Sequence, residues 1–416
     1  MVLERRGAGA LLIFTILFTI TACVLLAFRK EAFDIGIAAF GAGAAVMMLV
    51  AYNLAAAIFR HIDRITLVIC FFLLSVGLVM LARLNMEIAL RQMIWLAVGL
   101  VLLFVVVMVI RRAYDFGRWN YVFMAMSFGL LAFAYLFADT VGGARNWINF
   151  GPISFQPSEL SKVLFIIVSA YFFAEKRRIG ASIAYAAYAG LCVILLVLSN
   201  DLGAAMLYSG TFLVVFFAGT GRTLLTLVGL GVAGGGAVAS YYVIPHVKTR
   251  VEIWQNPWTF HQAQGYQIVQ GLMAIAAGGA FGAGLGMGYP EAIPVNTSDF
   301  IFAAISEEFG IIFGVIIILL YLVFIIRGMI IARNASSRFD ALLVFGATCM
   351  LSLQSFIIIA GVIKLIPLTG ITLPFVSAGG SSLIACLALV GIIEGVAVKN
   401  GERDEEEILE AGGEVI

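Results

Sequence analysis

The stretch "SDFIFAAISEEFG" (298–310) places three carboxylates directly before a long apolar run, in a chain that is only 12% charged. An acid that faces a water-filled cavity can act as a general base, and burial and nearby cations set its pKa. We therefore predict that Asp299 is a general base at the outer end of a membrane-spanning helix. Glu307 and Glu308, about two turns deeper, are predicted to support the site. The alternatives are a helix N-cap for Asp299 and a structural contact with a neighbouring cation for the glutamate pair.

A second polar stretch, "GGARNWINFGPISFQPSELSK" (142–162), brings a cation and a carboxylate to the start of another apolar run. Glu159 and Lys162 share a helix face, and charges within a span are costly unless they are paired or wet. The Arg145 guanidinium suits a diphosphate, and the Trp147 indole suits a sugar face or the lipid interface. These four residues predict a substrate site that opens outward, although a structural ion pair that fixes helix packing also explains Glu159 and Lys162.

A third stretch, "LIPLTGITLPFVSAGGSS" (365–382), interrupts the helical pattern with two prolines, three glycines and several hydroxyls, among them Ser377 and Ser381. Irregular backbone at membrane depth is tolerated only against protein or water. We predict a re-entrant element that lines a cavity and whose serines support the site. An ordinary turn between two spans is the alternative.

Two glycine-rich stretches carry no nucleotide-binding motif. Gly229, Gly231 and Gly234 form a GxGxxG pattern, but inside an apolar span and without a βαβ context. The stretch "GGAFGAGLGMG" (278–288) lacks the GK[ST] of a P-loop. We predict that it is a flexible or close-packed loop.

The elements that must position these residues are membrane helices. The chain has 416 residues, of which 62% are hydrophobic, against roughly 45–50% in soluble domains. The apolar runs are close to the length that crosses a bilayer, and each must be a helix to satisfy its own backbone. We predict an all-α polytopic bundle of about twelve transmembrane helices. The predicted spans are 9–28, 34–59, 65–83, 92–110, 119–138, 157–174, 181–199, 203–219, 223–243, 300–326, 340–363 and 379–398.

The distribution of basic residues predicts the orientation. If the N-terminus is cytoplasmic, 16 of the 25 lysines and arginines fall in inner segments, which agrees with the positive-inside rule. Both termini are then cytoplasmic, and the informative polar segments lie outside, at 139–158, 199–202, 244–299 and 364–378. The longest of these, 244–299, is rich in aromatic residues and glycine and is predicted to fold partly as interfacial helices. The acidic tail "GERDEEEILEAGGEVI" is predicted to be solvated and disordered.

Several function classes receive no support. The five cysteines lie far apart inside apolar runs and show neither a disulfide framework nor a metal-binding spacing. The three histidines form no HxxxH or HExxH pair, so the residues of any metal site are unknown. The net charge of +1 gives no indication of a nucleic-acid partner.

Together these stretches resemble the SEDS family, the FtsW/RodA/SpoVE group of bacterial cell-wall proteins. The resemblance covers about residues 62–398. It rests on "GARNWINFGPISFQPSELSK", "NDLGAAM" (200–206), "GYQIVQGLMAIAAGGAFGAGLG" (265–286), "SDFIFAAISEEFG" and "PLTGITLPFVSAGGSS", in this order. The family often has GARRW where this chain has Asn146 at the second arginine. Family members usually have ten spans, so the first two spans look like an N-terminal addition.

The resemblance implies a domain organisation: two extra transmembrane helices in 1–61, a ten-helix core in 62–398 with the large extracytoplasmic loop 244–299, and an acidic cytoplasmic tail in 399–416. It also implies a peptidoglycan glycosyltransferase of the bacterial cytoplasmic membrane. Such an enzyme polymerises lipid II at the outer face, among membrane lipids, for cell shape, cell division or sporulation. Its partner is a class B penicillin-binding protein, which crosslinks the product. The family's essential acid falls on Asp299.

A mechanism follows as a hypothesis. Asp299 takes a proton from the acceptor hydroxyl, which attacks the anomeric carbon of the donor and displaces the polyprenyl diphosphate with inversion. Arg145 and Lys162 stabilise the leaving diphosphate, with help from a divalent cation such as Mg²⁺ or Mn²⁺ if one is used. Glu159 holds Lys162, and Trp147 positions a sugar or the lipid.

Two other classes of function compete with a polymerase. A lipid II flippase or other transporter would also carry intramembrane charges and broken helices, but the polar residues here gather on one side of the membrane. A non-catalytic scaffold for a penicillin-binding protein is the third hypothesis.

Overall fold

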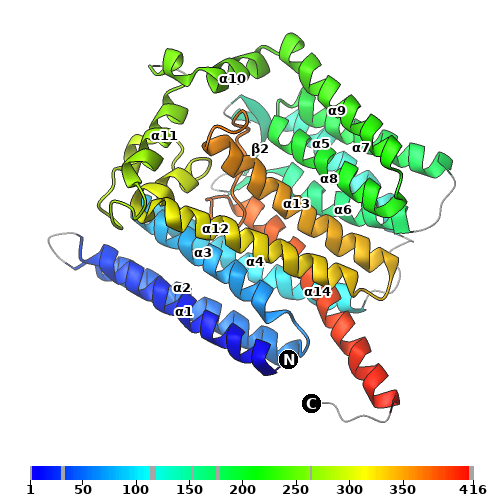
Figure 1. The fold of residues 1–416 in the computed structure, drawn as a ribbon, viewed down its shortest axis with the longest axis horizontal. Coiled ribbons are helices and arrows are strands. Elements are labelled where there is room, and N and C mark those ends of the chain that lie inside the picture. Colours follow the sequence, from blue (N-terminus) through cyan, green and yellow to red (C-terminus); the bar gives the residue numbers. More distant parts are fainter. Residues whose placement is uncertain are drawn as a thin grey trace.

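The computed structural model describes residues 2–29, 33–112, 119–141, 143–150, 153–174, 179–262 and 265–411. These residues form a bundle of long helices with a small sheet at one end (Figure 1). The helices are α1 (Val2–Ala27), α2 (Ile35–Ile58), α3 (Arg64–Leu84), α4 (Met86–Arg112), α5 (Asn120–Phe137), α6 (Pro157–Ala174), α7 (Ile179–Leu198), α8 (Leu202–Thr220), α9 (Thr223–Val243), α10 (Pro245–Gln255), α11 (Tyr266–Gly278), α12 (Ile301–Arg333), α13 (Arg338–Val362) and α14 (Gly380–Glu410). The predicted all-α membrane fold is confirmed.

Eleven helices in the described part of the chain are long and apolar enough to cross a membrane. They are α1 to α6, α8, α9 and α12 to α14. The remaining predicted span, 181–199, corresponds to α7. Its apolar part, Ala184–Leu198, is shorter than the eleven helices above. The helices continue beyond several predicted ends, so that α12 reaches Arg333.

The centre of the bundle is formed by α3 and α14, each 94% buried along its span, whereas α9 has no buried residue. Glycines on α14 and α4 let these two helices approach closely. A Cβ at Gly395 would lie 2.6 Å from Ile110, and a Cβ at Gly99 would lie 2.5 Å from Leu387. Close approach through small residues is a usual way for helices to pack in a membrane.

The two N-terminal helices form a pair along one edge of the bundle (Figure 1). α1 packs on α3 and on the start of α12, where the Phe18 ring lies 6.1 Å from the rings of both Phe309 and Phe313. A hydrogen bond joins the hydroxyls of Thr19 and Ser75 in the apolar contact with α3. The boundary between these helices and a core beginning at residue 62 stays a prediction.

The helix α12 is broken near its start, at Gly310. This residue has φ 87° and ψ 167°, a conformation that favours glycine. The glycine-rich loop 278–288 satisfies the groups that the break exposes: the amides of Ala283 and Gly284 donate to the carbonyls of Glu307 and Glu308 at 2.9 and 3.0 Å. In the other direction, the amides of residues 311 and 312 donate to the carbonyls of residues 279 and 280. The glycine-rich stretch is therefore a close-packed loop.

A three-stranded antiparallel sheet lies at one end of the bundle and was not predicted. It contains β1 (Asp139–Val141), β2 (Ala144–Phe150) and β3 (Ile153–Phe155), in the order β1-β2-β3. The segment 244–299 contains the helices α10 and α11 and two short 3₁₀ turns, in agreement with its predicted partly helical character.

The prediction of a disordered acidic tail is wrong for residues 401–410, which continue α14 as a helix that projects from the bundle (Figure 1). Basic side chains at or near the ends of other helices contact its first part. Glu405 pairs with Arg60 at 2.7 Å and with His61 at 2.6 Å, and Glu402 pairs with Arg111 at 2.6 Å. Residues 412–416 lie outside the described residues.

Replacing Gly310 by alanine is predicted to destabilise the protein. The added Cβ would meet the carbonyl oxygen of Ala280 and lie 2.5 Å from the amide nitrogen of Gly282. The backbone conformation alone is expected to cost about 1–3 kcal/mol, so the melting temperature of the purified protein should fall. Gly235→Ala is the control, because a Cβ there meets nothing within 4 Å. Equal melting temperatures for both variants would contradict the role given to the break.

Candidate functional site

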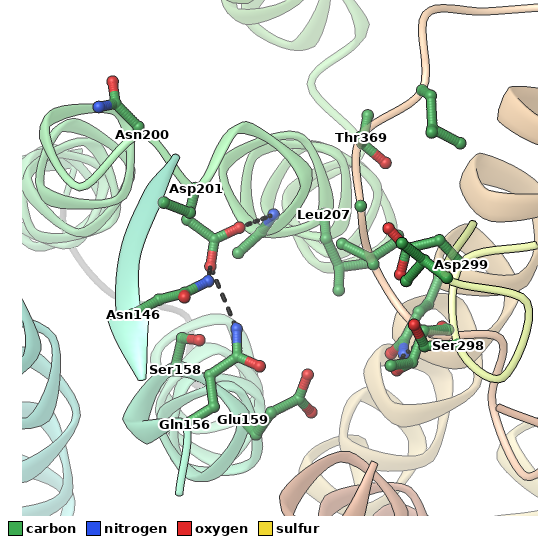
Figure 2. Close-up of a pocket in the computed structure, with 18 of the residues that line it drawn as sticks. Asn146, Gln156, Ser158, Glu159, Asn200, Asp201, Leu207, Ser298, Asp299 and Thr369 are labelled. Atoms are coloured by element: carbon green, nitrogen blue, oxygen red, sulfur yellow. Dashed lines mark hydrogen bonds between the residues drawn. The ribbon is translucent and has the colours of Figure 1, made fainter. Parts of the chain in front are cut away.

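A cavity of about 450 Å³ opens between α6, α8, α10 and α13 at the end of the bundle that carries the sheet. The segment 364–379 and the residues before α12 complete its walls. Its polar lining includes Asn146, Trp147, Gln156, Ser158, Glu159, Lys162, Asp201, Arg250, Ser298, Asp299, Gln354, Thr369 and Thr372. Figure 2 shows Asp201, Asn146 and Gln156 on one wall and Asp299, Ser298 and Thr369 on the opposite one.

Asp299 is held in the cavity by the segment between α13 and α14. The Ser377 hydroxyl donates to the carbonyl of Ser298 at 2.7 Å, and the Ala378 amide donates to the carbonyl of Thr297 at 2.8 Å. Gly370, at φ 75°, lies against the carboxylate, and a Cβ there would be 3.4 Å from Asp299 Oδ2. The predicted re-entrant segment therefore lines the cavity, as expected.

The environment of Asp299 favours a proton acceptor near neutral pH. Burial raises the pKa of Asp299 to about 6, against the opposite effects of a hydrogen bond from Ser298 and the charge of Arg250. The N-cap alternative does not hold, because the N-cap residue of α12 is Phe300 and it makes no side-chain capping bond. A carboxylate that does not cap a helix is available for chemistry.

Lys162 and Glu159 also reach the cavity from the first turns of α6. They form an ion pair in which the lysine side chain is 2% exposed and the glutamate side chain 14%. Lys162 Nζ donates to Gln354 Oε1 at 2.9 Å, and Gln354 Nε2 donates to the carbonyl of Thr372 at 2.9 Å. The pair thus links α6 through α13 to the segment that holds Asp299.

The opposite wall is built around Asp201, which was not among the predicted site residues. Its Oδ2 accepts from Asn146 Nδ2 at 2.9 Å and Gln156 Nε2 at 3.3 Å, and its Oδ1 accepts from the Ala204 amide at 3.0 Å (Figure 2). Asp201 is the N-cap of α8. The "NDLG" sequence, in a short segment predicted to lie outside, was the available signal. Amides and a carboxylate at one wall can bind sugar hydroxyl and acetamido groups.

Arg145 does not line the cavity. Its side chain is exposed, and its backbone amide donates to the carbonyl of Ser199 at 2.8 Å. Its neighbours Ala144 and Asn146 on β2 contribute to the cavity lining, and the pairing of β1 with β2 is irregular at this point. Trp147, by contrast, contributes to the lining as predicted.

Glu307 and Glu308 lie outside the cavity lining and hold the glycine-rich loop. Glu308 pairs with Arg83 at 2.8 Å and accepts from the Gly286 amide at 3.1 Å, while Glu307 accepts from the Tyr289 amide at 2.8 Å. The cation contact considered for the pair is therefore present at Glu308, whereas Glu307 binds the backbone.

Ser377 and Ser381 are also absent from the lining. Ser377 acts through the Ser298 carbonyl, and the buried Ser381 hydroxyl lies near the start of α14.

The described residues contain no group of three or more histidines, cysteines, aspartates or glutamates that could hold a metal ion. The carboxylates of the cavity do not converge on one point. The chemistry is therefore derived without a step through a metal, and the divalent cation stays a prediction.

Comparison with known proteins identifies the family. The FTSW_RODA_SPOVE family model, described as "Cell cycle protein", matches residues 52–402. The chain belongs to this family. Peptidoglycan glycosyltransferase RodA of Mycobacterium tuberculosis is 34% identical over 392 residues, which cover 86% of this chain and 83% of that protein. Stage V sporulation protein E of Bacillus subtilis is 33% identical and covers 80% of this chain and 96% of its own length.

Solved structures show the same architecture. A structure described as "Structural coordination of polymerization and crosslinking by a peptidoglycan synthase complex" matches with a TM-score of 0.70 and 27% identity, over 82% of this chain and 98% of the other. The rod shape determining protein RodA of Thermus thermophilus matches with a TM-score of 0.62 and 26% identity, over 81% and 96% of the two chains. The predicted family and multi-pass membrane fold are thus confirmed.

Removing the Lys162 charge is predicted to destabilise the protein. Lys162→Met would leave the Glu159 carboxylate partly buried without its cation, and breaking a buried pair costs about 3–5 kcal/mol. The melting temperature should fall, and the double variant Glu159→Gln/Lys162→Met should recover much of the loss. A stable Lys162→Met protein that has lost turnover would instead assign Lys162 a direct part in the reaction.

Proposed function

We propose that this chain is an inverting peptidoglycan glycosyltransferase that polymerises lipid II at the outer face of the bacterial cytoplasmic membrane. The observation that supports the proposal is the position of Asp299, a carboxylate with a raised pKa in a polar cavity at one end of the helix bundle. Relatives at 32–34% identity are named peptidoglycan glycosyltransferases. A cavity in this position suits a substrate with a lipid tail and a water-soluble head.

In the proposed reaction, Asp299 accepts the proton of the acceptor sugar hydroxyl. The hydroxyl oxygen forms a bond to the anomeric carbon of the donor from the face opposite the leaving group. The bond between this carbon and the diphosphate oxygen breaks, and the polyprenyl diphosphate leaves with the electron pair. A positioned general base contributes about 10²- to 10⁴-fold to the rate of such a step.

The other residues of the cavity have supporting roles in this proposal. The Glu159–Lys162 pair and Gln354 fix the position of α6 against the segment that holds Asp299. Lys162 adds a positive charge to the wall, and Trp147 offers an apolar face for a sugar or the start of the lipid. The Asp201 cluster opposite supports recognition of sugar hydroxyl groups.

The charge distribution supports the orientation. The end of the bundle opposite the cavity carries Arg60, Arg111, Arg327 and Lys399, which agrees with a cytoplasmic location for that end and for both termini. The cavity then faces outward, where lipid II is polymerised. The likeness to a peptidoglycan synthase complex supports a partner that crosslinks the glycan, for which we propose a class B penicillin-binding protein.

The decisive assay supplies lipid II to the purified protein in liposomes and measures glycan polymer. The wild-type protein should form polymer, and Asp299→Asn should be slower by about 10²- to 10⁴-fold. Because the buried acid has a raised pKa, its ionised form costs folding stability above pH 6. Asp299→Asn should therefore melt at or above the wild-type temperature at pH 8. Polymerisation within a few fold of wild type would refute the assignment of the base.

The same assay separates the competing functions. A flippase or a scaffold would move or organise lipid II without forming polymer from substrate already at the outer face. Polymerisation could require the penicillin-binding protein as an activator, so the assay is run with and without it. The penicillin-binding protein alone is the control for any polymer that it forms by itself.

The rate of polymerisation is predicted to depend on pH through Asp299. The base acts in its ionised form, and burial places its pKa at about 6. The rate should be constant above pH 7 and fall by about tenfold per pH unit below 6, as the carboxylate is protonated. A profile that stays flat from pH 8 to pH 5, with the protein still folded, would contradict this role.

A further inference from the structure

One cation of the cavity lining, Arg250, differs from Lys162 in having no carboxylate partner within the described part of the chain. It lies on α10, a short helix with little apolar character that follows the span α9. The described lining contains two cations, Lys162 and Arg250. Lys162 is already paired with Glu159, whereas Arg250 makes no ion pair within 4 Å among the described residues.

The hydrogen bonds of Arg250 use only one of its nitrogens. Nη1 donates to the carbonyl of Thr369 at 3.0 Å and to that of Leu368 at 3.4 Å. No described residue accepts from Nε or Nη2. A guanidinium has five N–H donors in a planar fork that matches two phosphate oxygens. Arg250 therefore presents an unused edge of its fork to a cavity that it lines together with Asp299.

Arg250 lines the same cavity as Asp299, a position from which it can bind a negatively charged leaving group. Its charge acts on Asp299, and its carbonyl partner Thr369 precedes Gly370, where an added Cβ would lie 3.4 Å from Asp299 Oδ2. In the proposed reaction, a cation that lines the same cavity as the base can stabilise the negative charge of the leaving group. The cost of keeping a partly buried guanidinium without a carboxylate is offset when an anion binds.

We propose that Arg250 binds the diphosphate of the polyprenyl donor and stabilises its negative charge as it leaves. The inference rests on the proposed function, and it replaces the part predicted for Arg145, whose side chain is exposed and outside the cavity lining. The bonds from Nη1 to the Leu368 and Thr369 carbonyls hold the guanidinium in place. Its remaining donors bind the phosphate oxygens.

The test measures binding of a diphosphate apart from catalysis. Farnesyl diphosphate and farnesol are titrated into the purified protein in nanodiscs by calorimetry. Arg250→Gln removes the charge but keeps an amide that can donate to the same carbonyls. Loss of a hydrogen bond to a charged group weakens binding by about 10- to 100-fold. We expect this increase in the Kd for farnesyl diphosphate and no change for farnesol.

Two variants on the same helix provide matched controls. Lys248→Gln removes one positive charge from α10 at an exposed position outside the cavity lining. Trp254→Phe removes the bond of 3.1 Å from Trp254 Nε1 to the Lys364 carbonyl, a second contact between α10 and the segment 364–379. Both controls should bind farnesyl diphosphate as the wild type does.

Three outcomes would overturn the proposal. The first is unchanged affinity in Arg250→Gln, and the second is an equal loss in Trp254→Phe, which would make Arg250 a structural contact. The third is wild-type protein that binds farnesyl diphosphate no better than farnesol. Arg250→Lys keeps the charge but lacks the planar fork of the guanidinium. Its Kd for farnesyl diphosphate should lie between those of the wild type and Arg250→Gln. This variant replaces Arg250→Gln in the test if the glutamine variant does not fold. Failure of the proposed function itself would appear separately, as absence of polymer from lipid II with wild-type protein.

Discussion

The need to satisfy every backbone hydrogen bond at membrane depth governs this structure. Gly310 breaks α12 inside a membrane span, and the glycine-rich loop supplies the missing donors and acceptors. The close contact is possible because the loop has little side-chain bulk: a Cβ at Gly278 or Gly282 would run into the backbone of residues 306–309. The break lies about three turns after Asp299, so its stability helps to fix where the carboxylate lies.

Polar side chains in the cavity also need hydrogen-bond or ion-pair partners. Its charged groups are held by partners from different elements, with Lys162 against Glu159 and Gln354, and Asp201 against two amides. The segment 364–379 connects both ends of this network, because Thr372 accepts from Gln354 and Ser377 donates to the residue before Asp299. A polar pocket of this kind can keep water and a sugar substrate next to lipid.

The sequence predicts the helices and part of the site because these depend on local patterns. Long apolar runs identify the spans, and Asp299, Glu159, Lys162 and Trp147 all reach the cavity. Arg145 was wrongly assigned because it lies in a short sheet that was not recognised in the sequence, where its side chain is exposed and outside the cavity lining. Arg250 was missed because it belongs to no local motif and reaches the cavity only through the fold. The helical tail was missed for the same reason. Its glutamates pair with Arg60 and Arg111, which are more than 290 residues away in the sequence.

The central claim is that Asp299 and the segment 364–379 share a polar cavity that opens to the outside of the cell. Ala378 lines this cavity, while all five native cysteines are buried. The most direct measurement is therefore the labelling of an Ala378→Cys variant in intact spheroplasts by a charged thiol reagent that does not cross membranes. The account predicts rapid labelling from outside that slows when lipid II is added. Labelling only after the membrane is permeabilised, or at a rate that lipid II does not change, would contradict it.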